Sequence, residues 1–328
     1  MFARRLRIEN LATFDAEIEN EIADNLMNIL ITGGAGYVGS ALVHRLLAVK
    51  EVKSITIFDN LSAKNFGIFT LLKTTDTKVN FVEGDILDAH KLNKEVKKAD
   101  VVYHLASLTV QNQAMDSHYY EQINHWGTSE VLNAVEQSNV QKFIYVSSAE
   151  IFDSGEIENE NAKANPKSFY AHSVYRAEEQ IKRMWDKKQC YIIRASEIFG
   201  YSLANQYVGL LNKFVFQAQF KGRIQIPGNG RNLVSFVSIN KTVEVLAQFL
   251  NTKAPSEVFH LSDYTFQTLD VVEILQELYP NLEFIFINPH LQLQDLALKP
   301  SEKLNSFINL KTNSLKDELR QYISYFSF

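Results

Sequence analysis

Near the start of this chain, a glycine-rich turn separates a short apolar run from a helical pattern, and few folds accommodate that combination. Ile29–Ile31 has the composition of a buried strand, and Thr32-Gly33-Gly34-Ala35-Gly36-Tyr37-Val38-Gly39 follows it directly. The apolar spacing of residues 41–47 is that of a helix. A strand, a tight turn and a helix in this order form a corner where the helix N-terminal N–H groups face an anion such as a pyrophosphate.

Each of three glycines has a distinct role in such a corner. Gly33 permits the tight turn, Gly36 lets the backbone approach a pyrophosphate, and Gly39 lets the helix pack closely on the strand. Asp59 ends the next apolar run, Ile55–Phe58, about 20 residues after Gly39, where an acidic residue hydrogen-bonds adenosine ribose hydroxyls. The alternative is a glycine turn without a ligand, but the strand, the helix and Asp59 together favour a dinucleotide site.

From Met27 onward, strand patterns alternate with helical patterns. Alternation of this kind predicts an α/β fold, a doubly wound parallel sheet covered by helices on both faces. Ligands of such sheets bind beyond the carboxyl ends of the strands, so we expect one site from the residues that follow successive strands: Gly33, Asp59, Asp85, Ala106 and Ser148. Beyond the two runs already described, strands are predicted over 79–82, 100–104, 142–148 and 190–194, with a helix over about 119–137.

After residue 194 the alternation loosens. Helical patterns near 207–220, 240–251 and 269–278 are mixed with short strands near 223–226, 257–261 and 283–287. We therefore predict a dinucleotide-binding domain over 27–194 and a smaller, mixed α/β substrate lobe over 195–328, which can return elements to the main sheet. Residues 1–26 form an N-terminal extension to which we assign no role.

Composition narrows the classes of partner and compartment. A net charge of −5 gives no reason to expect a nucleic acid or an anionic membrane as a partner. Cys190 is the only cysteine, which excludes an intramolecular disulfide and a cysteine-based metal site and fits a reducing cytoplasm. No apolar run approaches the roughly 20 residues that cross a bilayer. We expect a cytoplasmic protein that acts on a small molecule and holds no metal.

Several motifs together resemble one protein family. They are the turn at 32–39, Gly84-Asp85-Ile86, His104-Leu105-Ala106, Asn124 with Gly127-Thr128, and Ser147-Ser148. From about Met27 to the C-terminus, the chain resembles the extended short-chain dehydrogenase/reductase superfamily, in its NAD-dependent epimerase/dehydratase branch. The resemblance implies a Rossmann-type fold and NAD rather than NADP, since Asp59 would repel a 2′-phosphate. It implies a cofactor site formed by Gly33, Gly36, Tyr37, Val38, Gly39, Asp59, Asn60, Asp85, Ile86, Leu105, Ala106, Ser107 and Tyr170.

The chemistry of this family is hydride transfer at a carbon bearing a hydroxyl or a carbonyl. The resemblance implies that Ser148 holds that oxygen and that Tyr170 is the acid/base. Tyrosine has a pKa of about 10 and needs a nearby positive charge, which the family supplies with a lysine four residues later on the same helical face. Val174 occupies that position here. His172 and Arg176 lie roughly 200° and 240° around the helix from Tyr170, so the local helix offers no cation.

Three further polar residues have predicted roles. In relatives that are sugar-nucleotide dehydratases, a glutamate at the position of Glu150 takes part in proton removal; the alternative for Glu150 is a solvated loop carboxylate. We expect His104 to pack beside the cofactor site without catalysing. We expect Asn124 to hold backbone groups near the strand at 142–148, which is a structural role.

In the lobe, Ser196 and Glu197 are candidate substrate contacts. Sugar-nucleotide enzymes of the family usually carry an asparagine after the sixth strand and an arginine after a Gly-Asp-Gly turn, both for the substrate diphosphate. Glu197 and Val234 occupy these positions here. A carboxylate facing a pyrophosphate is unfavourable, and valine cannot make the bidentate contact of arginine. The stretch Gly228–Val237 instead resembles the 3β-hydroxysteroid dehydrogenase-like branch, which disfavours a nucleotide-sugar substrate.

Three hypotheses follow. The leading one is an NAD-dependent oxidoreductase acting on a secondary alcohol or ketone through Ser148 and Tyr170. The second is a nucleotide-sugar epimerase or dehydratase with tightly bound NAD, favoured by Glu150. The third is a module that senses NAD without catalysis, motivated by Val174. The resemblance also implies a homodimer formed by helices within 112–139 and 170–187.

Overall fold

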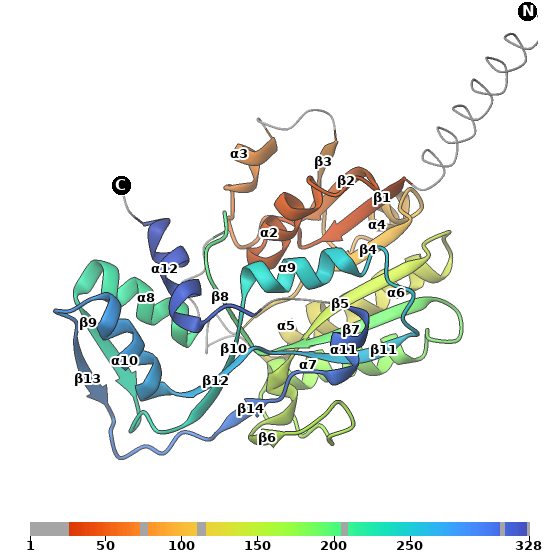
Figure 1. The fold of residues 1–328 in the computed structure, drawn as a ribbon. Helices are drawn as coiled ribbons and strands as arrows, with labels where there is room; N and C mark the ends of the chain where they lie inside the picture. Colours follow the sequence, from red (N-terminus) through yellow and green to blue (C-terminus); the bar gives the residue numbers. More distant parts are fainter. Residues whose placement is uncertain (1–25, 73–77, 110–115, 205–208, 309–311, 327–328) are drawn as a thin grey trace, which may run out of the picture.

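The computed structural model describes residues 26–72, 78–109, 116–204, 209–308 and 312–326. Its body is a seven-stranded sheet in which every neighbouring pair is parallel, in the order β11-β7-β5-β4-β1-β2-β3 (Figure 1). The α/β, doubly wound prediction is therefore confirmed. The strands are β1 (Met27–Thr32), β2 (Val52–Asp59), β3 (Val79–Glu83), β4 (Val101–His104), β5 (Lys142–Ser148), β7 (Gln189–Ala195) and β11 (Glu257–Leu261).

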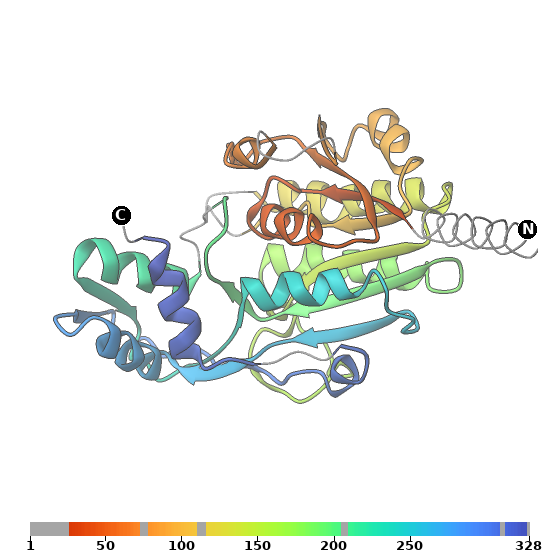
Figure 2. The ribbon, with the colours of Figure 1, turned by 45° about the horizontal axis from the view of Figure 1, so that its top comes forward.

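Helices cover both faces of this sheet, as Figure 2 shows. Successive residues of a strand point to opposite faces, so Ile29 and Ile31 enter one apolar cluster while Leu30 enters the other. One cluster includes α2 (Tyr37–Leu46) and α9 (Ile239–Gln248). The other includes α4 (Ala89–Val96), α6 (Thr128–Glu136) and α7 (Phe169–Lys182). Burial on both faces explains why the central strands are continuous apolar runs.

The helix predicted over 119–137 contains an irregular stretch. It consists of α5 (Ser117–Tyr120), a π-helical segment η1 (Glu121–Gly127) and α6. The side chain of Asp116 caps α5 by accepting the N–H of His118. π-Helical segments are rare and occur frequently at functional sites.

The lobe and the main sheet exchange elements. β11 comes from beyond residue 195 and pairs with β7, and α9 packs against α2, so both belong to the dinucleotide-binding body. In the other direction, β6 (Gly155–Ile157) leaves the first half of the chain and pairs with β14 (Leu296–Leu298) in the lobe. The lobe expected from the sequence therefore has no single boundary at residue 195.

The lobe itself has two sheets. The five-stranded one contains β6, β14, β8 (Glu197–Phe199), β10 (Leu233–Ser238) and β12 (Tyr264–Gln267). The two-stranded one pairs β9 (Arg223–Pro227) with β13 (Glu283–Ile287), and α8 (Leu210–Lys221), α10 (Thr268–Leu278) and α12 (Leu315–Ser324) pack beside them (Figure 1). The short elements α3 (Ile68–Leu72), η2 (Ala149–Phe152) and α11 (Glu302–Phe307) complete the described fold.

Some predicted features lie outside the described residues, among them residues 1–25 of the extension and the start of the helix predicted near 207. In the described part of the chain, no helix combines the length and the apolar character that a membrane crossing needs. Within the same ranges, no three His, Cys, Asp or Glu side chains gather as a metal ion would require.

Candidate active site

The glycine-rich turn joins β1 to α2 in close contact with the segment after β4. Gly33 has φ +71°, and a Cβ there would lie 2.5 Å from the backbone N of Ala106. A Cβ at Gly39 would clash with the carbonyl oxygen of Gly33, so the start of α2 can lie against the turn only without a side chain at 39. Gly36 is the N-cap of α2 and has no side chain to cap the helix, which leaves the first N–H groups to a ligand.

Asp59 stands at the end of β2 beside this turn. Its carboxylate accepts hydrogen bonds from the backbone N–H of Ala35 at 3.0 Å and of Leu61 at 2.8 Å. Burial raises the pKa of Asp59, and these two bonds offset part of that effect. Next to it, the amide of Asn60 donates to the Asp85 carboxylate at 3.0 Å. The turn and the end of β2 thus form one edge of the site.

The remaining predicted cofactor residues meet at the same edge. Leu105 donates its N–H to the carbonyl of Thr32 at 2.9 Å, and the Ser107 hydroxyl donates to the Asn124 amide oxygen at 3.2 Å. Ile86 contacts the position where Gly127 would carry a Cβ. Val38 packs against the main apolar cluster from the first turn of α2.

Tyr37, also predicted to contact the cofactor, directs its side chain elsewhere. Its hydroxyl donates to the carbonyl of Gly200 at 2.7 Å, and Ser202 donates to the Tyr37 carbonyl at 2.7 Å. The side chain therefore links α2 to the lobe, and only the backbone N–H of Tyr37 remains as a group for a phosphate. This contact could not be predicted from local sequence patterns, because its partners lie more than 160 positions away.

Ser148, Glu150 and Tyr170 converge at the carboxyl end of β5. The Ser148 hydroxyl accepts the N–H of Glu150 at 3.1 Å. It is also close enough to Tyr170 to lower the pKa of that phenol. Tyr170 comes from the first turn of α7, which Ser168 caps by accepting the N–H of Ala171 at 3.0 Å. Two hydroxyls and a carboxylate from separate elements thus share one small region.

Burial, followed by the negative charge of Glu150, raises the pKa of Tyr170 well above its ordinary value, and the nearby Ser148 hydroxyl offsets part of the rise. No lysine or arginine of the described ranges is among the groups that set this pKa. Val174 is 1% exposed and packs in the apolar cluster beneath α7. Arg176 pairs with Glu121 at 2.9 Å instead. Among the described groups that set the pKa of Tyr170, none is a cation that takes the place of the missing lysine.

Glu150 and Glu197 give this region further acidic character. The side chain of Glu150 is open to solvent on one side, yet the surrounding protein raises its pKa by desolvation. Burial raises the pKa of Glu197 to about 7, and the charge of Glu150 adds to the effect. The two carboxylates are therefore close enough to influence one another.

The side chain of Glu197, from β8, lies at the N-terminus of α8. Its Oε1 accepts the N–H of Leu211 at 2.9 Å, and the nearby N–H of Leu210 also lowers the pKa of the carboxyl group. Gly209 precedes the helix with φ +89°, and a Cβ there would lie 2.9 Å from that oxygen. The neighbouring candidate, Ser196, is 6% exposed and has a hydroxyl without a hydrogen-bond partner among the described residues, so it faces the interior.

His104 and Asn124 are structural. The His104 ring lies 2.6 Å from the Thr32 hydroxyl and 2.8 Å from that of Thr128, and burial lowers its pKa to about 3, which keeps the ring neutral. Asn124 accepts the N–H of Leu108 at 2.7 Å and donates to its carbonyl at 3.0 Å. It therefore holds the segment after β4, and the expectation that it holds groups near β5 is wrong.

A buried ion pair beneath the site was missed by the sequence analysis. Arg194 and Glu178 approach to 2.7 Å with almost no exposure, and the Ser147 hydroxyl donates to Glu178 at 2.6 Å. This pair joins β7 to α7 and fixes the strand end that leads into Ser148. The sequence does contain a sign of this pair: Arg194 lies within the apolar run at 190–195, and a buried charge requires a partner of opposite charge.

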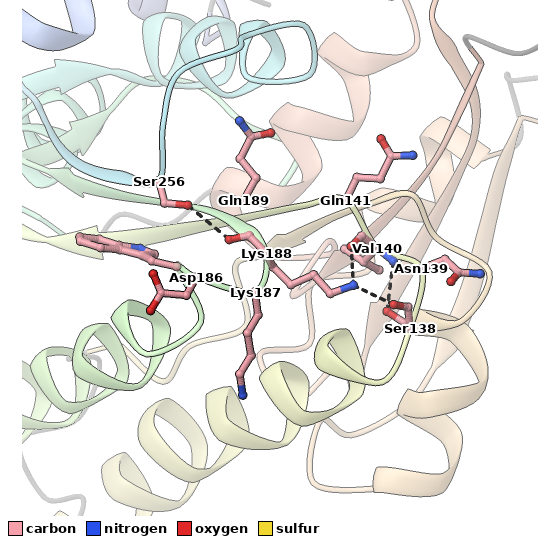
Figure 3. Close-up of a pocket in the computed structure, with 10 residues that line it drawn as sticks. Ser138, Asn139, Val140, Gln141, Asp186, Lys187, Lys188, Gln189 and Ser256 are labelled. Carbon is pink, nitrogen blue, oxygen red and sulfur yellow. Dashed lines mark hydrogen bonds between the residues drawn. The ribbon is translucent and has the colours of Figure 1, made fainter.

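A cavity of about 640 Å³ is lined by residues 138–141, 185–189 and Ser256 (Figure 3). It lies at the amino ends of β5 and β7, whereas the candidate site lies at their carboxyl ends. Lys188 spans it, donating to the carbonyls of Ser138 at 2.8 Å and Val140 at 3.0 Å. Because the ammonium group of Lys188 is already bonded to backbone carbonyls, we do not place the active site in this cavity.

Comparisons with known proteins agree with this geometry. Residues 29–262 match the model of the NAD dependent epimerase/dehydratase family. The chain is 30% identical over 265 residues to human dTDP-D-glucose 4,6-dehydratase, covering 76% of this chain and 72% of that protein. It is 33% identical over 176 residues to dTDP-glucose 4,6-dehydratase of Mycolicibacterium smegmatis, covering 52% and 51% of the two chains.

Solved structures show the same fold. UDP-glucuronic acid 4-epimerase from Bacillus cereus, in complex with UDP-glucuronic acid and NAD, superposes with a TM-score of 0.81 at 22% identity, covering 91% of this chain and 98% of that one. A dTDP-glucose 4,6-dehydratase from Streptomyces venezuelae, with NAD bound, gives a TM-score of 0.78 at 22% identity, covering 92% and 97%.

Proposed function

This chain belongs to the NAD-dependent epimerase/dehydratase family, and on that basis we propose that it transfers a hydride at a carbon bearing a hydroxyl or carbonyl group in a small-molecule substrate. The family uses NAD, and the residues present fit that group. The turn at Gly33, Gly36 and Gly39 leaves backbone space that any Cβ would fill, and Asp59 offers a carboxylate for ribose hydroxyls. When bound, NAD supplies the carbon that accepts or returns the hydride.

The observation that carries the proposal is the proximity of Ser148 and Tyr170, which influences the pKa of the phenol, at the carboxyl end of β5. Both hydroxyls can bond one substrate oxygen, and this holds the reacting carbon in place. The proton of that oxygen then moves to or from Tyr170. Glu150 adds a carboxylate beside this pair, and in the dehydratase alternative it would remove a proton from the substrate. Asn124, bonded to Ser173 at 3.0 Å, anchors α7 and thereby positions Tyr170.

The protonation state of Tyr170 at neutral pH suits reduction of a carbonyl better than oxidation of an alcohol. Because its pKa is raised, Tyr170 holds its proton at neutral pH and can donate it to a carbonyl oxygen during reduction. Oxidation of an alcohol needs the phenolate, so we expect that direction to accelerate as pH rises into the alkaline range.

A second candidate is a nucleotide-sugar dehydratase or epimerase. It is favoured by Glu150 and by the dTDP-sugar and UDP-sugar activities in the names of the relatives. It is disfavoured by Glu197, whose carboxylate takes the N–H donors of α8, and by Val234, which offers no charge. The third candidate is a module that binds NAD without catalysis; its support is the uncompensated Val174.

The test uses purified protein, NAD and NADH. We expect NAD binding by calorimetry, and hydride exchange with a panel of ketones and secondary alcohols that the variant Tyr170→Phe loses. Full turnover by Tyr170→Phe on a substrate so identified refutes the assigned mechanism. Binding of dTDP-glucose or UDP-glucuronic acid selects the second candidate, and NAD binding without any exchange selects the third.

We also propose a homodimer in the cytoplasm. Exposed aromatic side chains lie within the first predicted helix, at Tyr119 and Trp126, and directly before the second, at Phe169, and such side chains are typical of interfaces. Residues 112–115 of the predicted interface are outside the described ranges. The free, buried thiol of Cys190 is consistent with a reducing compartment.

A further inference from the structure

β13 is an apolar strand that the rest of the lobe leaves uncovered. Phe284, Ile285, Phe286 and Ile287 are each about 40% exposed, and Leu291 beyond them is 48% exposed. Figure 1 shows β13 at the outer side of the lobe, away from the main sheet. Its partner β9 is different, because Ile224 and Ile226 are fully buried there.

One edge of β13 carries backbone groups without a partner strand. The described residues pair β13 with β9 alone. Glu283 donates its N–H to Gly222, and Ile287 accepts the N–H of Gly228, so the alternate residues 283, 285 and 287 face β9. In a parallel ladder the intervening residues point the other way. The N–H and C=O groups of Phe284 and Phe286 therefore face the open edge.

Unpaired edges of this kind are templates for another strand, and proteins usually protect them with charges, proline or bulges. β13 has none of these between Phe284 and Ile287. The only charged residue of the strand, Glu283, is already paired with Arg223 at 2.6 Å. The occupant thus has to supply apolar side chains and an extended backbone without a charge in its centre.

We propose that β13 pairs with β13 of a second copy of this chain, antiparallel and about a two-fold axis through Ile285. In that register Phe284 lies opposite Phe286 of the partner subunit, and each such pair exchanges two backbone hydrogen bonds. Ile285 lies opposite Ile285 of the partner subunit in a non-hydrogen-bonded pair. No two residues of like charge lie opposite one another in this register. β9, β13 and their copies then form one continuous four-stranded sheet.

The size of this interface sets its strength. Two five-residue edges bury less than the roughly 1,200 Å² of a standard stable interface. We therefore expect an association that depends on protein concentration. Where the helices within 112–139 and 170–187 also form a dimer, each such dimer carries two β13 edges, so the β13 contact joins one dimer to another, and a tetramer closes where the two axes intersect at right angles.

The test is a charge swap at the axis, read by analytical ultracentrifugation across protein concentrations. Ile285→Lys and Ile285→Glu each place like charges opposite one another, so each alone is expected to lose one association step. Mixing the two variants is expected to restore it. Gln225→Lys is the matched control: it is exposed on β9, beside Ile285 but off the open edge, and should leave association unchanged.

A cross-link tests the register. The Cα atoms of a non-hydrogen-bonded antiparallel pair lie about 4.5 Å apart, within the range of a disulfide. Ile285→Cys is therefore expected to form a disulfide-linked dimer under mild oxidation, whereas Gln225→Cys is not. NAD binding and the melting temperature verify folding of each variant. Wild-type protein whose association is the same as that of both charge variants, or equal cross-linking at 225 and 285, overturns the proposal.

Discussion

Restoring a cation beside Tyr170 is the sharpest test of how this site departs from its family. Val174 lies one helical turn after Tyr170 and is 1% exposed. The side chain of a lysine at this position is therefore surrounded by protein and stays on the same helical face as Tyr170. Side chains at this spacing are about 5–6 Å apart. At an effective dielectric constant of about 20, a unit charge at that distance is worth about 3 kcal/mol, or about two pKa units.

We therefore expect Val174→Lys to lower the pKa of Tyr170 by about two units. A lower pKa makes the phenolate available at lower pH, so the alkaline limb of alcohol oxidation should move about two pH units down. Burying the lysine costs stability, and the melting temperature should fall. Val174→Met is the matched control, since it has a similar length and no charge.

The measurement does not depend on knowing the substrate. The ring carbons of 13C-labelled tyrosine are titrated by NMR in the NAD complex, and the Tyr170 signal is assigned by its loss in Tyr170→Phe. Equal pKa values for Tyr170 in Val174→Lys and Val174→Met would refute the argument that position 174 controls this acid. NAD affinity in both variants shows that the cofactor site has survived.

Three other predictions concern stability and binding. Because burial raises the pKa of Glu197 to about 7, the free energy of unfolding should fall by up to about 3 kcal/mol as the pH rises from about 4.5 through 7. Glu197→Gln should abolish this fall, which denaturant unfolding at pH 5 and pH 8 measures. An equal effect of the substitution at both pH values would contradict the prediction. Gly39→Ala should weaken NAD binding measurably by calorimetry, because its methyl group meets the carbonyl oxygen of Gly33; unchanged affinity would show that the turn adjusts. Arg194→Met should lower the free energy of unfolding by about 3–5 kcal/mol, because it leaves the buried carboxylate of Glu178 unpaired. Adding Glu178→Leu to the same chain should recover much of this loss. A double variant no more stable than Arg194→Met would contradict the view that the unpaired charge causes the loss.

Local patterns determined much of the fold. The apolar runs and the glycine-rich turn predicted the parallel sheet, and the helices predicted near 240–251 and 269–278 are α9 and α10. The short lobe strands β6, β8, β10, β12 and β14 were not predicted. Most of them have three or four residues, too few for the period of a strand to stand out in the sequence.

The sequence by itself determined which residues reach the carboxyl edge of the sheet, because the residue after each parallel strand must lie there whatever the strand order. It also determined that Val174 shares a helical face with Tyr170, since that depends on helical period alone. Only the tertiary structure decided that no described cation replaces the lysine, that Glu197 bonds the start of α8, and that Tyr37 reaches Gly200. These contacts join residues that different elements bring together, and their distances follow from packing between elements rather than from the spacing within any one of them.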